Sequence, residues 1–271
     1  MERSRQNPVL LVGSHSSWPK AYAQATCLLQ GYRASKGPSK TFNVVFDIDD
    51  TLLTESQDEQ GYRSMEEVLD LVDVCKAVGA RVYIITARSN DPSIVFWTAS
   101  QLARIGLLSR TPQGLEVGMR VNDFGARTLP PGHPVLSFRR TLQDPNNRDH
   151  VTKKAVPRGT KVRHYDGLFL IPDVYRENKA LVSEAKLIAR TFIREKLGGG
   201  PTVLSVGDQW TDGVLFGDEK EIAALDAASN AADIKDDLRR ANTGSRVGDP
   251  YKIVRVADGV TSWFLKLPAS Y

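Results

Sequence analysis

Three acidic residues, Asp47, Asp49 and Asp50, directly follow a short apolar run at 43–46. The β-branched residues of this run predict a buried strand, so the carboxylates lie where the chain leaves the sheet. In an open α/β sheet ligands bind at that end, and Asp47 and Asp49 point the same way while the backbone stays extended. Carboxylates this close repel unless they share a cation or a proton, so a Mg²⁺ site and a proton-sharing acid/base pair are both open interpretations. An Asp-rich turn that only caps the local backbone is the structural alternative.

A second pair of acidic residues follows a second buried run, at 202–206. Gly207 allows a tight turn there, and Asp208 and Asp212 are presented on the loop after the strand. The two acidic clusters therefore have the same local design, a buried strand followed at once by carboxylates.

A third apolar run, at 81–88, contains the hydroxyl of Thr86 near its end. A helix is predicted between this run and the first strand, beginning near Ser64 and ending at Gly79. A right-handed β-α-β crossover would make the two strands parallel neighbours, with Thr86 and Asp47 at the same edge of the sheet.

These strings, in this order, resemble the motifs of the haloacid dehalogenase superfamily, whose phosphatases form a phosphoaspartate. The string Asp-Ile-Asp-Asp-Thr-Leu at 47–52 is similar to motif I, and the strand that ends in Thr86 is similar to motif II. The string Gly-Asp-Gln-Trp-Thr-Asp at 207–212 is similar to motif IV of the plant and bacterial acid phosphatase branch. The resemblance spans 43–215 and implies a Rossmann-like three-layer α/β/α fold with a parallel central sheet.

The resemblance also implies a role for each candidate residue in hydrolysing a phosphoric monoester. Asp47 would be the nucleophile that becomes an aspartyl phosphate, and Asp49 the general acid and base. Mg²⁺ would be held by the carboxylates of Asp47 and Asp208 and by the backbone carbonyl of Asp49. The hydroxyl of Thr86 and the backbone N–H of Ala87 would bind the phosphoryl oxygens.

The superfamily also places a lysine in the helix that precedes motif IV, and the chain offers Lys179 and Lys186. Lys179 heads the predicted helix and should stand at the same sheet edge as the Asp residues. Lys186 lies two turns further along, so we expect it to be a solvated charge. The prediction is therefore Lys179 as the catalytic and substrate-binding lysine, with Asp212 as its supporting partner.

The 271-residue chain has 41% hydrophobic and 25% charged residues, which is typical of one globular α/β domain. An N-terminal helical extension is expected over 1–40, with a short strand at 9–12 before its helix, and an irregular, lid-like insertion is expected over 107–166. The interval between the first strand and the first helix after it is too short for a large cap domain. Two cysteines imply no disulfide framework, and without an apolar run long enough for a membrane span a cytoplasmic location is expected.

The excess of positive charge is concentrated between positions 139 and 164, a segment with eight basic and two acidic residues, in a chain of net charge +4. A lid that draws in a polyanionic substrate and a solvated basic loop are both consistent with this excess. The favoured substrate is a small phosphorylated molecule, such as a nucleotide or sugar phosphate. A phosphatase acting on nucleic-acid ends and a non-catalytic storage or binding protein are the alternatives. The sequence gives no signal for a membrane partner or for an oligomeric state.

Overall fold

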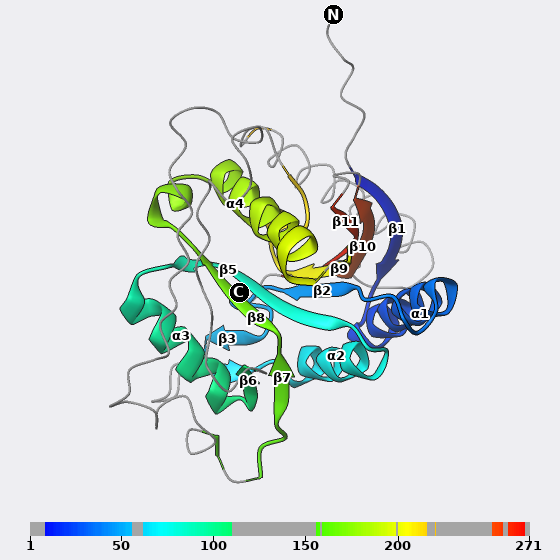
Figure 1. Cartoon of the computed structure of the whole chain (residues 1–271), viewed down its shortest axis with the longest axis horizontal. Helices are drawn as coiled ribbons and strands as arrows, with labels where there is room; N and C mark the ends of the chain where they lie inside the picture. Colours follow the sequence, from blue (N-terminus) through cyan, green and yellow to red (C-terminus); the bar gives the residue numbers. More distant parts are fainter. Residues whose placement is uncertain are drawn as a thin grey trace, which may run out of the picture.

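The computed structural model describes residues 9–55, 62–109, 156–157, 159–198, 200–215, 220, 251–256 and 260–268. A seven-stranded sheet with the order β1-β10-β11-β9-β2-β5-β8 forms the centre of this part of the chain (Figure 1). Its strands are β1 (Val9–His15), β2 (Asn43–Phe46), β5 (Arg81–Ser89), β8 (Gly167–Ile171), β9 (Thr202–Gly207), β10 (Tyr251–Val256) and β11 (Thr261–Lys266). The strands from β11 to β8 are parallel, whereas β10 is antiparallel to both β1 and β11. The prediction of a mixed α/β fold with a mostly parallel central sheet is confirmed.

Helices cover both faces of the sheet. They are α1 (Trp18–Lys36), α2 (Glu66–Ala77), α3 (Pro92–Arg104) and α4 (Lys179–Phe192), and α4 continues into a π-helical turn, η4 (Ile193–Gly198). Helix α4 lies on one face of the sheet, while α1 and α2 lie on the other (Figure 1). The connection from β2 through α2 to β5 is the predicted crossover between parallel neighbours.

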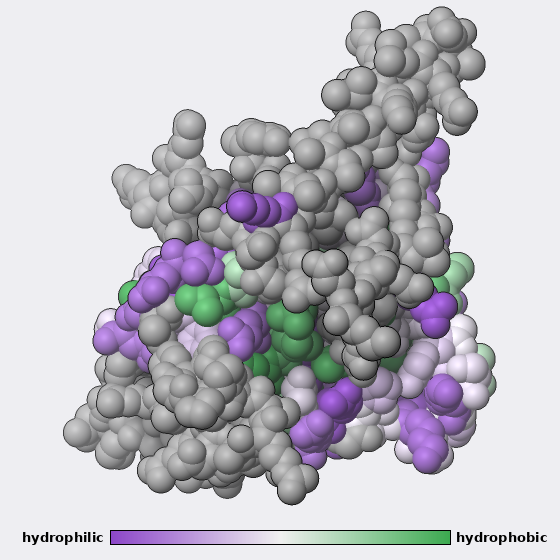
Figure 2. Space-filling view, turned by 90° about the horizontal axis from the view of Figure 1, so that it is seen from above, coloured by the Kyte–Doolittle hydropathy of each residue, from purple (hydrophilic) through white to green (hydrophobic). Residues whose placement is uncertain are grey.

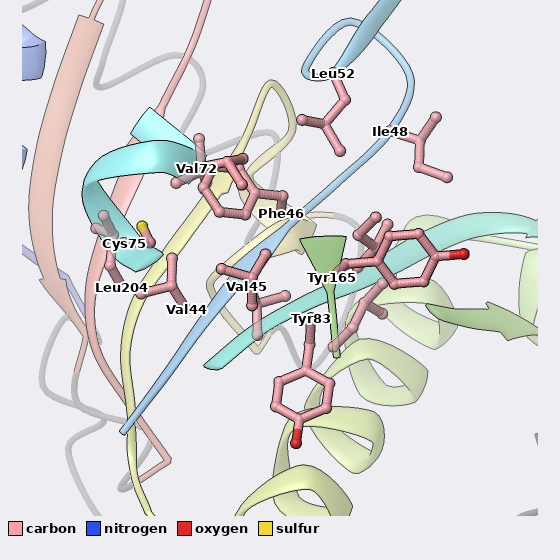
Figure 3. Close-up of a cluster of buried hydrophobic side chains, with 14 of the residues drawn as sticks. Val44, Val45, Phe46, Ile48, Leu52, Val72, Cys75, Tyr83, Tyr165 and Leu204 are labelled. Carbon is pink, nitrogen blue, oxygen red and sulfur yellow. The ribbon is translucent and has the colours of Figure 1, made fainter. Parts of the chain in front are cut away.

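Strand β2 is buried on both faces, as a central parallel strand must be. Val72 and Cys75 of α2 lie over Val44 and Phe46 (Figure 3). On the face that α4 covers, the Phe169 ring lies between two aromatic rings, with centroid distances of 6.2 Å to Tyr83 and 6.3 Å to Phe192. Each such side chain contributes roughly 1.5–3 kcal/mol when it is fully buried, so the core fixes the position of β2 firmly.

Two small ladders lie outside the central sheet. A hairpin of β3 (Leu53–Glu55) and β4 (Tyr62–Ser64) follows the first acidic loop, and β6 (Leu107–Ser109) pairs in parallel with β7 (Arg163–Tyr165). The predicted insertion at 107–166 therefore begins with one strand of a ladder and carries the other near its end. Its interior lies outside the described residues, as do the basic residues at 139–158.

The strand expected at 9–12 of the N-terminal segment is confirmed, because β1 joins the central sheet as an edge strand beside β10. No helix among the described residues is long and apolar enough to cross a membrane. Seen from above, hydrophobic residues are visible near the centre of the view, with hydrophilic residues on several sides (Figure 2). The large apolar side chains exposed in the described residues are Trp97, Val162, Leu197 and Leu215.

Candidate active site

Two parallel neighbouring strands bring the two acidic clusters together. Phe46 at the end of β2 is paired with Val206 of β9, and the backbone N–H of Asp47 donates to the Val206 carbonyl at 2.9 Å. Asp47 directly follows β2 and Asp208 directly follows β9, and both are buried. Two buried carboxylates thus lie side by side at the carboxyl edge of the sheet, where α/β proteins bind ligands.

A tight loop carries the chain away from Asp47. The Ile48 carbonyl accepts hydrogen bonds from the backbone N–H groups of Leu52 and Leu53 at 2.8 and 2.9 Å. Asp50 adopts a positive φ of 53°, a conformation that Asp tolerates better than most residues. Ile48 and Leu52 are both fully buried and anchor the loop in the core (Figure 3). The loop therefore positions its acidic residues on a fixed backbone.

Asp212 completes a group of three buried carboxylates with Asp47 and Asp208. Each offers an oxygen, and these oxygens all lie within 4.8 Å of one another. A group of this kind suits a hard divalent cation with oxygen ligands. Both carboxylate oxygens of Asp212 already have partners, however, since one pairs with Lys186 and the other accepts from the Gln209 backbone N–H at 2.9 Å. Asp47 and Asp208 are therefore the better candidates for metal ligands.

The lysine of the site is Lys186, and the prediction that favoured Lys179 is wrong on this point. Lys186 is 2% exposed, and its ammonium group donates to Asp47 Oδ1 at 2.9 Å and to Asp212 Oδ1. Lys179 is exposed at the first position of α4. The expectation that Lys186 would be a solvated helix charge is contradicted by its burial.

The misplacement has a geometric cause. The strand register puts Asp47 about level with Phe169 of β8, but β8 continues to Ile171. A 3₁₀ turn, η3 (Asp173–Arg176), then carries the chain further before α4 begins. Helix α4 thus starts well beyond the carboxylates and returns toward them. Two turns, about 10 Å at 1.5 Å per residue, bring Lys186 to their level.

The charges of the group change one another's proton affinity. Burial raises the pKa of Asp47 well above its usual value, and the ammonium group of Lys186 only partly opposes this. Burial alone would lower the pKa of Lys186, but the Asp212 and Asp47 carboxylates outweigh it and raise that pKa. Burial, with the negative charge of Asp212, raises the pKa of Asp208 to about 6. Lys186 therefore stays charged, and a further cation would relieve the repulsion that remains.

Gly207 is required by close approach rather than by its own backbone angles. A Cβ atom at this position would overlap the Asp212 side chain. The Asp212 backbone carbonyl is held from the other side by Ser205 Oγ at 2.7 Å and by the Arg190 guanidinium at 2.9 Å. Asp212 is thus fixed in place as the partner of Lys186.

Thr86 is buried on β5, but the strand does not end there. Strand β5 continues to Ser89, with an irregular register after Thr86. The Thr86 hydroxyl accepts from the backbone N–H of Arg88 at 3.3 Å, and Ala87 is half-buried against the core. Both residues lie on the central strand beside β2, which agrees with the predicted neighbourhood of Thr86 and Asp47.

Asp49 lies at the exposed side of the group, and its partner was not predicted from the sequence. Its side chain is 48% exposed and forms an ion pair with Arg88, with 2.6 Å between Asp49 Oδ1 and Arg88 Nη2. The only sequence signal for Arg88 is a basic residue two positions after Thr86 in a buried strand.

No model of a known protein family matches the chain, and no curated protein matches it.

Proposed function

We propose that the protein is a Mg²⁺-dependent phosphatase of the haloacid dehalogenase type that hydrolyses phosphoric monoesters through an aspartyl phosphate on Asp47. One observation carries the proposal. Asp47 is a buried carboxylate at the end of a central parallel strand, with Lys186 on one oxygen and Asp208 beside it. An isolated buried carboxylate would take up a proton, and Lys186 favours the ionised form that can attack phosphorus.

The cation would be held by the carboxylates of Asp47 and Asp208 and by the backbone carbonyl of Asp49. When bound, Mg²⁺ neutralises charge on the phosphoryl oxygens and orients the group for in-line attack. The fit rests on the carboxylate oxygens of the site, which are close enough to share one ion. Asp212 would not bind the ion but would orient Lys186, whose charge would also stabilise the transferring phosphoryl group.

The chain's own residues would then act in two steps. A carboxylate oxygen of Asp47 forms a bond to phosphorus while the bond from phosphorus to the leaving oxygen breaks, and Asp49 gives its proton to that oxygen. In the second step Asp49 takes a proton from water, the water oxygen bonds to phosphorus, and the acyl phosphate bond breaks. Inorganic phosphate leaves, and both carboxyl groups return to their starting state.

A small phosphorylated molecule, such as a nucleotide or a sugar phosphate, is the substrate class we favour. The described part of the basic segment does not support nucleic acid as the substrate. Lys161 pairs with Asp73 at 2.7 Å, and Arg163 pairs with Asp73 and Asp70 at 3.0 and 3.1 Å. These cations therefore neutralise carboxylates of α2.

The proposal is tested with a panel of nucleotides, sugar phosphates and 3′- or 5′-phosphorylated oligonucleotides, with Mg²⁺ or EDTA. We expect Mg²⁺-dependent phosphate release that is lost in Asp47→Asn, because an amide fills the same volume but cannot attack phosphorus. Asp70→Asn, which alters an exposed carboxylate of α2, is the matched control and should remain active. Activity that survives in Asp47→Asn would refute the nucleophile, and preference for oligonucleotides would refute the substrate class.

A further inference from the structure

Arg88 forms a two-point ion pair with the Asp49 carboxylate through two nitrogens of its guanidinium group. Nε donates to Asp49 Oδ2 at 2.9 Å, and Nη2 donates to Asp49 Oδ1 at 2.6 Å. This two-point contact fixes the plane of the carboxylate as well as its position. Arg88 is 8% exposed, so solvent screens its side of the pair only weakly.

The guanidinium group is itself held on its remaining side by α3. Nη1 donates to Thr98 Oγ1 at 3.2 Å and to Gln101 Oε1 at 2.6 Å. The Trp97 ring covers the guanidinium carbon, with 5.0 Å between that carbon and the ring centroid. These contacts hold the guanidinium group of Arg88 in place, and Arg88 in turn holds the carboxylate of Asp49.

Asp49 needs such a support. Its side chain is half-exposed, and the pairs within the buried group, from Asp47 and Asp212 to Lys186, do not include it. An exposed carboxylate has several rotamers of similar energy, whereas proton transfer requires the carboxyl group within hydrogen-bond reach of the reacting oxygen.

We propose that Arg88 is the positioning residue for proton transfer by Asp49, an inference that rests on the proposed function. Arg88 acts through Asp49 and does not itself carry the proton. The two-point contact fits the ionised carboxylate that takes a proton from water, and when Asp49 carries the proton its other oxygen still accepts from Arg88. Its contribution should therefore scale with how much the leaving group needs a proton. An alkoxide leaves poorly unless it is protonated, whereas 4-nitrophenolate leaves readily without help.

Arg88→Gln is tested on 4-nitrophenyl phosphate and on an alkyl phosphate such as glycerol phosphate. We expect kcat/KM to fall about 100-fold on the alkyl ester, the scale of general-acid catalysis, and to fall about threefold or less on the aryl ester. Arg88→Lys keeps the charge but loses the two-point contact, so its loss on the alkyl ester should be intermediate. In an Asp49→Asn background, Arg88→Gln should add nothing to the dependence on the leaving group.

Arg163→Gln is the matched control, since it removes a buried arginine that pairs with carboxylates of α2, and it should change both substrates equally. Thermal unfolding of each variant separates loss of fold from loss of function, and Arg88→Lys keeps the test valid if Arg88→Gln is unstable. Equal losses on both esters in the Arg88 variants of an active enzyme would overturn this inference alone. A wild-type protein inactive on both esters would overturn the proposed function with it.

Discussion

Lys186 pairs with the two buried carboxylates of Asp47 and Asp212. The charge of its ammonium group offsets the free-energy cost of burying theirs. Removing one member of a buried ion pair leaves an uncompensated charge, at a cost of roughly 3–5 kcal/mol. We therefore expect Lys186→Met to lower the free energy of unfolding by this amount and to lower kcat about 100-fold or more. Urea unfolding and phosphatase assays measure the two effects.

Lys179→Met is the matched control for this prediction. It makes the same substitution on the same helix, but at an exposed position two turns away. Both quantities should change little in this variant. A loss of activity in Lys179→Met together with an active Lys186→Met would restore the assignment that the sequence favoured.

The raised pKa of Asp208 predicts how stability depends on pH. An unfolded aspartate has a pKa of about 3.9, so between this value and about pH 6 the folded state holds a proton that the unfolded state releases. The folded state binds more protons there, so the free energy of unfolding of the metal-free protein should fall as the pH rises through this window. The raised pKa of Asp47 acts in the same direction.

Asp208→Asn removes one of these ionisations. We expect it to reduce the loss of stability by roughly 3 kcal/mol over the whole window and by roughly 1.4 kcal/mol above pH 5. Urea unfolding in EDTA at about pH 5 and about pH 7.5 measures the difference. Mg²⁺ should stabilise the wild-type protein at the higher pH and should stabilise Asp208→Asn far less. Identical pH slopes in the two proteins would contradict the raised pKa.

At the scale of elements, the sequence predicts the strands of the site better than the helix that completes it. The strands β2 and β9 are short apolar runs with acidic residues immediately after them, a local pattern that needs no knowledge of the fold. The position of Lys186 depends on how far β8 and η3 carry the chain beyond the sheet edge before α4 begins. It is therefore set by β8, η3 and α4 together and not by a local pattern. Arg88 was missed because its partner Asp49 belongs to another strand's loop, and periodicity carries no information about such a contact.

The turn between β9 and η5 (Trp210–Asp212) brings Gly207 close to the side chain of Asp212. A Cβ atom at Gly207 would displace the Asp212 side chain and with it the orientation of Lys186. We expect Gly207→Ala to lower both stability and kcat by large factors. Gly31→Ala is the matched control, because its Cβ meets nothing within 4 Å and alanine favours the interior of α1. Full activity in Gly207→Ala would mean that Asp212 is not held as described.

At the scale of the whole molecule, segments from near the two ends of the chain complete one side of the central sheet. Strand β1 pairs with β10, and β10 pairs with β11, which lies beside β9 of the site. Deleting residues 1–15 would expose the hydrogen-bonding edge of β10, and exposed edges promote association between chains. We expect lower thermal stability and aggregation that depends on concentration, whereas deleting only residues 1–8 should be neutral. Equal behaviour of the two truncations would show that β1 is dispensable.

If phosphate is transferred to Asp47, a covalent aspartyl phosphate forms during turnover and can be trapped. The protein is mixed with a phosphomonoester and Mg²⁺, quenched in acid within one turnover, digested and examined by mass spectrometry. We expect one phosphate on the peptide that contains Asp47, sensitive to neutral hydroxylamine as an acyl phosphate is. It should be absent from Asp47→Asn and from EDTA-treated protein. Phosphate found on another residue of an active enzyme would refute Asp47 as the nucleophile.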